Sequence, residues 1–288
     1  MKFAIATTFS DPAQLDPIAR TADECGWDAL TFSDHIVHPE RMESKYPYTA
    51  DGGTYWDAQN PWPDPWITIA SLAAVTTRLH FTTNVFILPA RNPVLVAKAV
   101  STAAVLSGDR VALGIGVGWM KEEFEILEQN FHTRGKRTDE AIEILRLLWS
   151  GEMVEYHGRH YDFAPMQMRP APEQPVPIFV GGLSEPALAR AARCDGWISV
   201  MHTTDEIREY SQRLHRLREE QNNTEGDFEI LVSATDVFDL DGYRRLAEAG
   251  ATGVITAPWR FYSGNTLDLN EKLEGIRRFA DDIIHPLR

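Results

Sequence analysis

Residues 110–124, Arg-Val-Ala-Leu-Gly-Ile-Gly-Val-Gly-Trp-Met-Lys-Glu-Glu-Phe, decide the fold class of this chain. The run Arg110–Val117 has the length and apolar pattern of a strand buried on both faces. After the glycines comes a segment with acidic residues in its first turn, which suit the positive end of a helix dipole. A strand that ends in this way is where α/β enzymes keep their chemistry. The glycines either let a flat ring or a phosphate approach the main chain, or serve only tight strand-to-helix packing.

The composition limits the class of protein and of partner. The chain has 288 residues, and its 28 basic and 42 acidic residues give a formal net charge of −14. This balance disfavours nucleic acid and anionic membranes as partners, so any phosphate must be held locally. The cysteines, Cys25 and Cys194, are far apart and indicate no disulfide framework. Met1–Ala6 lacks a signal-peptide pattern and no apolar run approaches the ~20 residues of a membrane span, so we expect a cytoplasmic protein.

Strand-like and helix-like segments alternate along almost the whole chain. Strands are expected at residues 3–8, 28–33, 80–88, 110–117, 176–180, 196–200, 228–233 and 252–257. A helical pattern follows each of them, which predicts a (β/α)8 TIM barrel formed by residues 1–288 as a single domain. The alternative is a doubly wound open sheet. That fold usually has a glycine fingerprint after its first strand, and Thr7-Thr8-Phe9-Ser10-Asp11 is not one.

Two insertions interrupt the alternation. Residues 36–64, after the second strand, have no periodicity but contain several prolines and aromatic residues, including Tyr55, Trp56 and Trp62. A long ordered loop of this kind is typical of a lid, although the aromatic residues also suit the simpler role of sealing the barrel end. Residues 152–177, before the fifth strand, predict a hairpin that turns at Gly158, followed by a proline-rich connector.

Candidate functional residues gather where the expected strands end, because those ends meet at one opening of a barrel. His35 can donate or accept a proton near neutral pH, and Asp34 is positioned to orient it, although adjacent strand residues point in opposite directions. Ser184 is either a helix N-cap or, after Gly181-Gly182, part of an anion site. We predict no metal site, since no two histidines have ligand spacing with a carboxylate partner. A serine hydrolase is disfavoured by the lack of a nucleophile elbow.

The chain resembles the bacterial luciferase-like monooxygenase superfamily, most closely its branch of oxidoreductases that depend on the deazaflavin coenzyme F-420. The resemblance covers nearly the whole chain and implies a (β/α)8 barrel that binds a flavin or deazaflavin at the carboxyl ends of its strands. The matching segments are residues 27–35 (Trp-Asp-Ala-Leu-Thr-Phe-Ser-Asp-His), 88–98, 106–119, 134–140, the hairpin 154–163 and residues 177–182.

Site residues follow from this resemblance position by position. It implies a non-prolyl cis peptide at Asn84-Val85, behind the cofactor ring, and a catalytic role for His35 beside the hydride-transfer centre. Residues implied to contact the ring are Asn84, Val85, Gly116, Val117, Gly118 and Trp119. Those implied to hold the phosphate are Gly181, Gly182, Leu183, Ser184, Met201, His202 and Thr203. The substrate side of the pocket would consist of Tyr55, Trp56, Trp62 and Trp66.

The sequence departs from the family pattern at two places. Trp119 stands where some deazaflavin enzymes have an acid, which removes one proton donor and argues against a sugar-phosphate dehydrogenase. His202-Thr203-Thr204 stands where some have a lysine, so phosphate and tail binding would rely on backbone groups or on Arg260.

The resemblance therefore predicts an enzyme that transfers a hydride between coenzyme F-420 and a small organic substrate. One alternative is an FMN-dependent two-component monooxygenase, which takes reduced flavin from a partner reductase and activates oxygen. A further alternative is a non-catalytic flavin or deazaflavin carrier, for which residues 36–64 would leave the pocket open. A homodimer is a family expectation.

Overall fold

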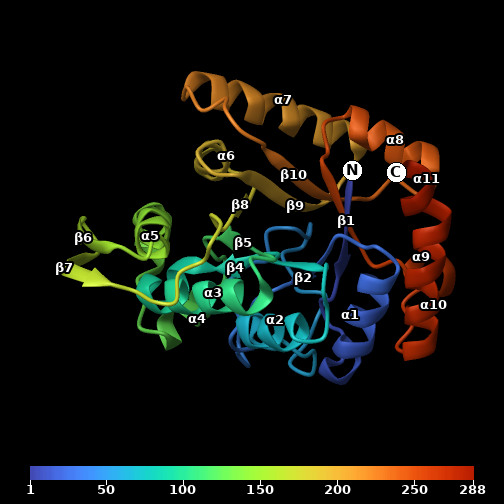
Figure 1. The fold of residues 1–288 in the computed structure, drawn as a ribbon, viewed down its shortest axis with the longest axis horizontal. Coiled ribbons are helices and arrows are strands. Elements are labelled where there is room, and N and C mark those ends of the chain that lie inside the picture. Colours follow the sequence, from blue (N-terminus) through green and yellow to red (C-terminus); the bar gives the residue numbers. More distant parts are fainter.

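Eight parallel strands, the third of them broken into two short pieces, form a closed barrel in the computed structural model, which describes residues 1–288 (Figure 1). The order of the strands around the barrel follows their order in the sequence. Pairing of Phe81 with Val111 and of Thr82 with Ala112 joins the third strand to the fourth. The predicted TIM barrel is thereby confirmed. The strands are β1 (Lys2–Ala6), β2 (Ala29–Phe32), β3 (His80–Thr83) with β4 (Phe86–Ile87), β5 (Val111–Gly116), β8 (Ile178–Gly181), β9 (Gly196–His202), β10 (Glu229–Ala234) and β11 (Gly253–Thr256).

The third strand of the barrel differs from the single continuous strand expected over residues 80–88. It is broken into β3 and β4, and the peptide bond between Asn84 and Val85 at the break is cis. The cis position that the family resemblance implied is confirmed. Residue types common in strands, including Thr82, Thr83, Val85, Phe86 and Ile87, stand on both sides of the break, which is why the pattern alone predicted one strand.

The helices surround the barrel and follow the strands in sequence (Figure 1). Side-chain caps and prolines define where several begin: Asp64 accepts hydrogen bonds from the amides at the start of α2, and Asn92 does so for α3. The helices are α1 (Leu15–Glu24), α2 (Pro65–Ala73), α3 (Pro93–Ser107), α4 (Lys121–Ile126), α5 (Arg134–Trp149), α6 (Glu185–Ala191), α7 (Thr204–Glu220), α8 (Leu240–Glu248), α9 (Arg260–Ser263), α10 (Leu269–Phe279) and α11 (His285–Leu287). None of them is both long enough and apolar enough to cross a membrane.

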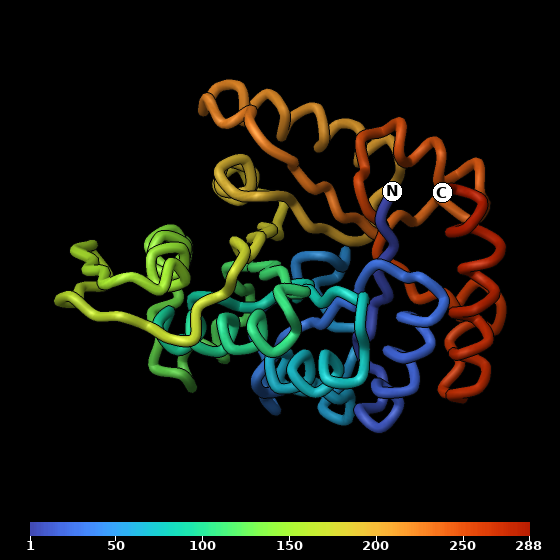
Figure 2. Tube along the Cα trace, viewed as in Figure 1, coloured from blue at the N-terminus to red at the C-terminus, as the bar shows by residue number.

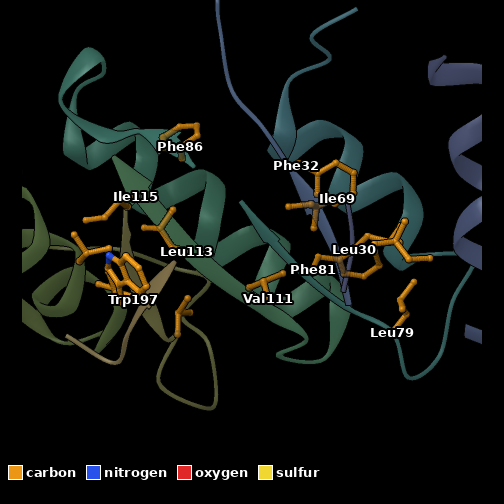
Figure 3. Close-up of a cluster of buried hydrophobic side chains, with 14 of the residues drawn as sticks. Leu30, Phe32, Ile69, Leu79, Phe81, Phe86, Val111, Leu113, Ile115 and Trp197 are labelled. Carbon is orange, nitrogen blue, oxygen red and sulfur yellow. The ribbon is translucent and has the colours of Figure 1, made fainter. Parts of the chain in front are cut away.

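The main core lies between the outer faces of the strands and the helices. Figure 3 shows Leu30, Phe81 and Leu113 projecting from the strands into this layer, with Ile69 of α2 packed beside them. All four side chains are fully buried. Burying a side chain of this size stabilises the fold by about 1.5–3 kcal/mol, so this layer holds the barrel rigid beneath its mouth.

Two long segments stand outside the barrel pattern. Residues 36–64, called the lid below, contain neither helix nor strand. The second segment forms the antiparallel hairpin of β6 (Met153–His157) and β7 (Asp162–Gln167), which lies at the left edge of the molecule beside α5 (Figure 2). The Glu140 carboxylate of α5 accepts hydrogen bonds from the amides of residues 159–161 and so holds the hairpin turn.

Candidate functional site

The strands present small side chains to the barrel interior near their carboxyl ends. Below this level the interior is filled by Phe179, Ile198, Leu231 and Ile255. Since side chains alternate along a strand, the next inward positions are Ala6, Ser33, Gly181, Val200, Ser233 and Ala257. These residues are half-exposed although they point inward. The mouth of the barrel therefore has an apolar floor and small walls.

Val85 projects into this mouth and explains two of the glycines. A Cβ atom on Gly116 would lie 2.6 Å from Val85 Cγ2, and one on Gly181 would lie 2.8 Å from Val85 Cγ1. Gly118 has a φ of +79°, and its Cβ would lie 2.7 Å from both Ile87 and Phe124. Of the two interpretations of the glycines in the 110–124 stretch, tight strand-to-helix packing is directly visible for Gly118, which lies against Phe124 of α4, whereas Gly116 packs against Val85. Val117 and Trp119, between and after them, are half-exposed at the mouth.

His35 is held at the mouth by a buried carboxylate. Its Nδ1 lies 3.0 Å from Oε2 of Glu123, and the other oxygen of Glu123 accepts a hydrogen bond of 2.7 Å from the Ile36 amide. The Glu123 side chain is fully buried and that of His35 is 9% exposed. Because the carboxylate accepts from the imidazole at Nδ1, Nε2 is the ring nitrogen that is free to exchange a proton.

Asp34 does not orient His35, which corrects the expectation that neighbouring residues form a pair. Its carboxylate accepts two hydrogen bonds from the Arg91 guanidinium, at 2.7 and 2.8 Å, and one of 2.9 Å from the Ile87 amide. Adjacent residues of an extended chain point to opposite sides, so Asp34 faces β4 while His35 faces the mouth. Asp34 therefore stabilises the broken third strand of the barrel.

An aromatic cage covers His35 from the side of the lid. The His35 ring lies 4.7 Å from the ring of Trp62, 5.6 Å from that of Trp56 and 5.8 Å from that of Trp119, measured between centroids. We define the cage as Phe9, Tyr46, Tyr55, Trp56, Trp62 and Trp119, which contact one another mainly edge to face. The structure therefore brings two of the four residues predicted to bind substrate, Trp56 and Trp62, to the predicted catalytic histidine, and Tyr55 joins the cage through Trp56.

Trp66 is separate from this group. It lies in the first turn of α2, is 6% exposed, and packs in the main core against Phe86 at 5.9 Å between ring centroids. The structure does not bring it to the mouth with Tyr55, Trp56 and Trp62. Its place is set by Pro65 and the Asp64 cap, which start the helix and turn this side chain inward.

The first turn of α4 also anchors the lid. One oxygen of the Glu122 carboxylate accepts hydrogen bonds from the amides of Glu43, at 2.7 Å, and Ser44, at 3.1 Å. The Ser44 hydroxyl in turn accepts one of 2.9 Å from the Lys121 amide. Burial opposes ionisation of Glu122, but the hydrogen bonds from Ser44 and the amides outweigh it and lower its pKa from 4.5 to about 2. The lid is therefore tied to the barrel by an ionised carboxylate.

The loop after β8 contains four of the residues expected to hold the phosphate, Gly181 to Ser184. Gly182 has a φ of +113°, and only Ala187 lies near its Cβ position. Ser184 occupies the N-cap position of α6, but its hydroxyl makes no capping hydrogen bond, so the capping role is not observed. Ser184 is exposed and Leu183 half-exposed, so both are accessible from solvent.

The loop after β9 begins at His202, the last residue of the strand. His202 is buried, its Nε2 lies 2.7 Å from the Ser199 hydroxyl, and its ring stacks on Trp197. Burial lowers the pKa of His202 below 6.5, and the Glu206 carboxylate acts weakly in the other direction. His202 is thus neutral at pH 7 and provides no positive charge. Thr203 caps α7, and Met201 is 59% exposed.

Comparison with known proteins identifies the family. The sequence profile described as luciferase-like monooxygenase matches residues 3–264. The chain belongs to this family. Among its relatives, the uncharacterized protein Rv0940c of Mycobacterium tuberculosis is 41% identical over 287 residues, 99% of each chain. A Gordonia bronchialis protein named F-420-dependent glucose-6-phosphate dehydrogenase is 30% identical over 229 residues, which are 77% of this chain and 62% of the other.

Solved structures share the fold of this luciferase-like protein. The monooxygenase RslO1 from Streptomyces bottropensis matches with a TM-score of 0.77 and 20% identity over 100% of both chains. The coenzyme F-420-dependent tetrahydromethanopterin reductase from Methanopyrus kandleri matches with a TM-score of 0.76 and 13% identity, over 100% of this chain and 99% of that one. At these identities the likeness shows the fold alone. The family match places the chain among oxidoreductase and monooxygenase enzymes.

Three residues of the site in this luciferase-like chain were not predicted. Glu123 appeared in the sequence only as an acid suited to a helix start, yet its side chain is the hydrogen-bond partner of His35. Phe9 has a φ of +64° in the β1–α1 loop, and Tyr46 lies in the lid. The aromatic richness of the lid was the available signal for Tyr46. Nothing in the local pattern pointed to Phe9.

Removing the lid anchor is expected to loosen the lid without unfolding the barrel. In a Glu122→Ala variant the amides of residues 43 and 44 lose their acceptor, and we expect their hydrogen exchange to accelerate roughly tenfold or more. Because the folded-state pKa is lowered, the anchor is present above about pH 4.5 and is lost only as the pH falls towards about 2. Glu125→Ala, in the same helix but outside the anchor, is the control. Equal exchange in both variants would contradict this role of Glu122.

Proposed function

We propose that this chain is an oxidoreductase that binds coenzyme F-420 and transfers a hydride between it and a small organic substrate. The observation on which this rests is His35, held by buried Glu123 at the barrel mouth beneath a closed aromatic lid. A histidine in this position suits acid–base chemistry next to a redox centre. A closed lid beside His35 favours an enzyme over a carrier, because redox intermediates need protection from water.

The residues at the mouth fit a flat tricyclic cofactor with a phosphate-bearing tail. Small walls, the projecting Val85 and half-exposed Val117 and Trp119 leave apolar contact surface for a ring. Asn84 is half-exposed beside Val85, at the break of the third strand. When bound, the deazaflavin would supply the hydride donor or acceptor. The residues that would hold it are Asn84, Val85, Gly116, Val117, Gly118 and Trp119 at the ring and Gly181, Gly182, Leu183, Ser184, Met201 and Thr203 at the phosphate.

His35 and Glu123 would divide the proton chemistry between them. Glu123 keeps the imidazole in one orientation and one tautomer through Nδ1, so that Nε2 takes up or releases the proton that accompanies hydride transfer. The aromatic cage leaves the His35 side chain only 9% exposed. Once His35 is protonated, the Glu123 carboxylate would stabilise the positive charge of its imidazole.

The comparisons support a deazaflavin as the cofactor. A relative that is 30% identical is named as F-420-dependent, and a fold match at a TM-score of 0.76 is an F-420-dependent reductase. A monooxygenase solved in complex with FMN also shares the fold, with a TM-score of 0.60, which keeps FMN as the alternative cofactor. The difference between them can be measured directly.

Equilibrium binding of the purified protein to coenzyme F-420 and to FMN, side by side, tests the proposal. We expect F-420 to quench protein fluorescence with a dissociation constant at least tenfold below that of FMN, a difference of ~1.4 kcal/mol. Ser184→Ala should weaken F-420 binding several-fold by removing a hydroxyl donor, whereas Ser71→Ala, on the outer face of α2, should not. A preference for FMN would instead indicate a two-component monooxygenase with a separate reductase. Binding of neither would overturn the cofactor assignment.

A further inference from the structure

We propose that the substrate of this site carries a flat aromatic group, and that the Trp56 side chain occupies the place of this group in the closed lid. This inference rests on the proposed function and narrows its substrate class. Three observations support it: the rings that surround Trp56, the position of Trp56 against His35, and the way in which the middle of the lid is held.

The Trp56 ring lies at the centre of the aromatic cage. Every other ring of the cage has its centroid within 6.2 Å of the Trp56 centroid, and most of these rings stand edge to face against it. The nearest are those of Tyr46, at 4.9 Å, and Tyr55, at 5.0 Å. Although it belongs to a segment without helix or strand, Trp56 is only 8% exposed. The remaining rings of the cage thus form an aromatic box that an indole fills.

Trp56 also covers the imidazole of His35. The two rings are 5.6 Å apart between centroids, and their planes differ by 33°. Trp62 and Trp119 instead meet His35 nearly at right angles. The His35 side chain is 9% exposed, and a reacting atom must come within hydrogen-bond reach of Nε2. A substrate therefore has to displace a neighbouring ring, and a flat group in the place of Trp56 would face the imidazole as the indole does.

The middle of the lid is attached to the barrel by packing. Hydrogen bonds of residues 45–63 run within the segment itself: the Tyr46 amide donates to the Gly52 carbonyl, and the Thr54 hydroxyl donates to the Trp56 carbonyl. The hydrogen bonds to α4 described above lie outside this middle part, on its amino-terminal side. Trp56 can therefore leave the box with the middle of the lid while the carboxylates of α4 keep their partners.

Two rings of the box come from the barrel and would remain when the middle of the lid lifts. Phe9 has a φ of +64°, in the left-handed region that a residue with a side chain rarely adopts, so its surroundings must hold it there. Its ring is tilted by 34° to that of Trp56, whereas the Trp119 ring meets Trp56 at 80°. A flat aromatic group in this place keeps both kinds of contact. A saturated ring of the same size is thicker and has no π face, so it would keep neither.

The two roles open to Trp56 predict opposite effects of its removal. If Trp56 occupies the substrate position, it competes with the substrate, and the apparent affinity is lowered by the fraction of molecules in which the position is free. Replacing it with alanine then strengthens binding. If Trp56 were instead a wall of the substrate pocket, the same change would remove a contact surface and weaken binding.

Calorimetric titration of the full chain separates these roles, with naphthalene-2-methanol as the flat probe and decahydronaphthalene-2-methanol as its saturated counterpart. For Trp56→Ala we expect the Kd of the flat probe to be roughly tenfold or more below its value in the wild type, and below that of the saturated probe by a similar factor. Trp56→Phe, which keeps a ring in the box, should stay near the wild type. Leu106→Ala, at the exposed end of α3, is the surface control and should change neither Kd.

Chemical modification of His35 tests the position of Trp56 without a ligand. Diethyl pyrocarbonate acylates accessible imidazole nitrogens, and peptide mass spectrometry follows each histidine separately. We expect His35 to react roughly tenfold or more faster in Trp56→Ala than in the wild type, and the flat probe to restore its protection. His285, which is exposed, should react at the same rate in both proteins.

Fluorine NMR of the wild type covers the case in which Trp56→Ala does not fold. With 5-fluorotryptophan in place of tryptophan, the Trp56 resonance is the one that is lost in Trp56→Phe. It should shift when the flat probe is added, because the indole leaves the box, and stay in place with the saturated probe.

The outcomes separate this inference from the proposed function. Weaker or unchanged binding of the flat probe in Trp56→Ala, equal binding of the saturated probe, or an unmoved Trp56 resonance at saturation would overturn this inference and leave the F-420 assignment intact. Failure of F-420 to bind would overturn the proposed function, and with it the role of the aromatic compound as a redox substrate, whatever the probes show.

Discussion

Replacing His35 with alanine should lower kcat by two to four orders of magnitude while leaving affinity for coenzyme F-420 near that of the wild type. General acid–base catalysis contributes about 10²–10⁴-fold, and this imidazole is the group whose Nε2 is free at the mouth. The alanine side chain cannot exchange a proton. Steady-state kcat together with a separate fluorescence titration of F-420 measures the two effects independently.

A histidine elsewhere on the surface provides the control for this result. His285, near the carboxyl terminus, is exposed and pairs only with Asp281. His285→Ala should therefore leave kcat unchanged. Partial recovery of His35→Ala activity by added imidazole would support loss of a proton carrier over a packing defect. Wild-type turnover in His35→Ala would remove this residue from the mechanism.

Substitution of Glu123 should affect both turnover and stability. Glu123→Ala leaves the Ile36 amide and Nδ1 of His35 without their acceptor inside the protein, so we expect the free energy of unfolding to fall by about 2–4 kcal/mol. Glu123→Gln keeps the size and one acceptor oxygen. It should retain most of the stability but lower kcat roughly 10–100-fold with little change in KM, because the imidazole is held less firmly.

Glu125→Gln is the matched control for these variants, since Glu125 lies in the same helix and forms an exposed ion pair with Lys121. Exposed pairs of this kind contribute about 0–1 kcal/mol. Urea unfolding and steady-state kinetics of the three variants would separate positioning from stability. If Glu123→Gln retained wild-type kcat, the carboxylate would have no positioning role.

The barrel was predictable because its signals are local and repeated. Strand and helix periodicities alternate along the chain, and each strand can be recognised from its own residues alone. The break at Asn84-Val85 was not visible in that pattern, since buried residues lie on both sides of it, Thr82 and Thr83 before and Phe86 and Ile87 after. Its position came instead from the family resemblance.

The site was predictable in part, and the misses share one cause. The chain positions of His35, Trp56 and Trp62 after the second strand indicated a place at the mouth. The partner of His35 did not follow from its position, because Glu123 lies 88 residues away and only the closed barrel brings the two together. Asp34 was the nearer candidate in sequence, but its direction on the strand takes it to Arg91. Trp66 is the opposite case: it lies next to the lid in sequence, but its helix turns its side chain into the core.

The attachments of the lid divide it into fixed ends and an exchangeable middle. Glu123 holds the chain at residue 36, Glu122 holds it at residues 43 and 44, and Asp64 begins α2 at the far end. Residues 45–63 lie between these attachments and include the Tyr46, Tyr55, Trp56 and Trp62 rings of the cage. Changing the length of such a segment costs little, about 0.6 kcal/mol per doubling. Grafting a different segment between the same ends would thus give the barrel a new substrate preference while the proton-transfer pair keeps its place.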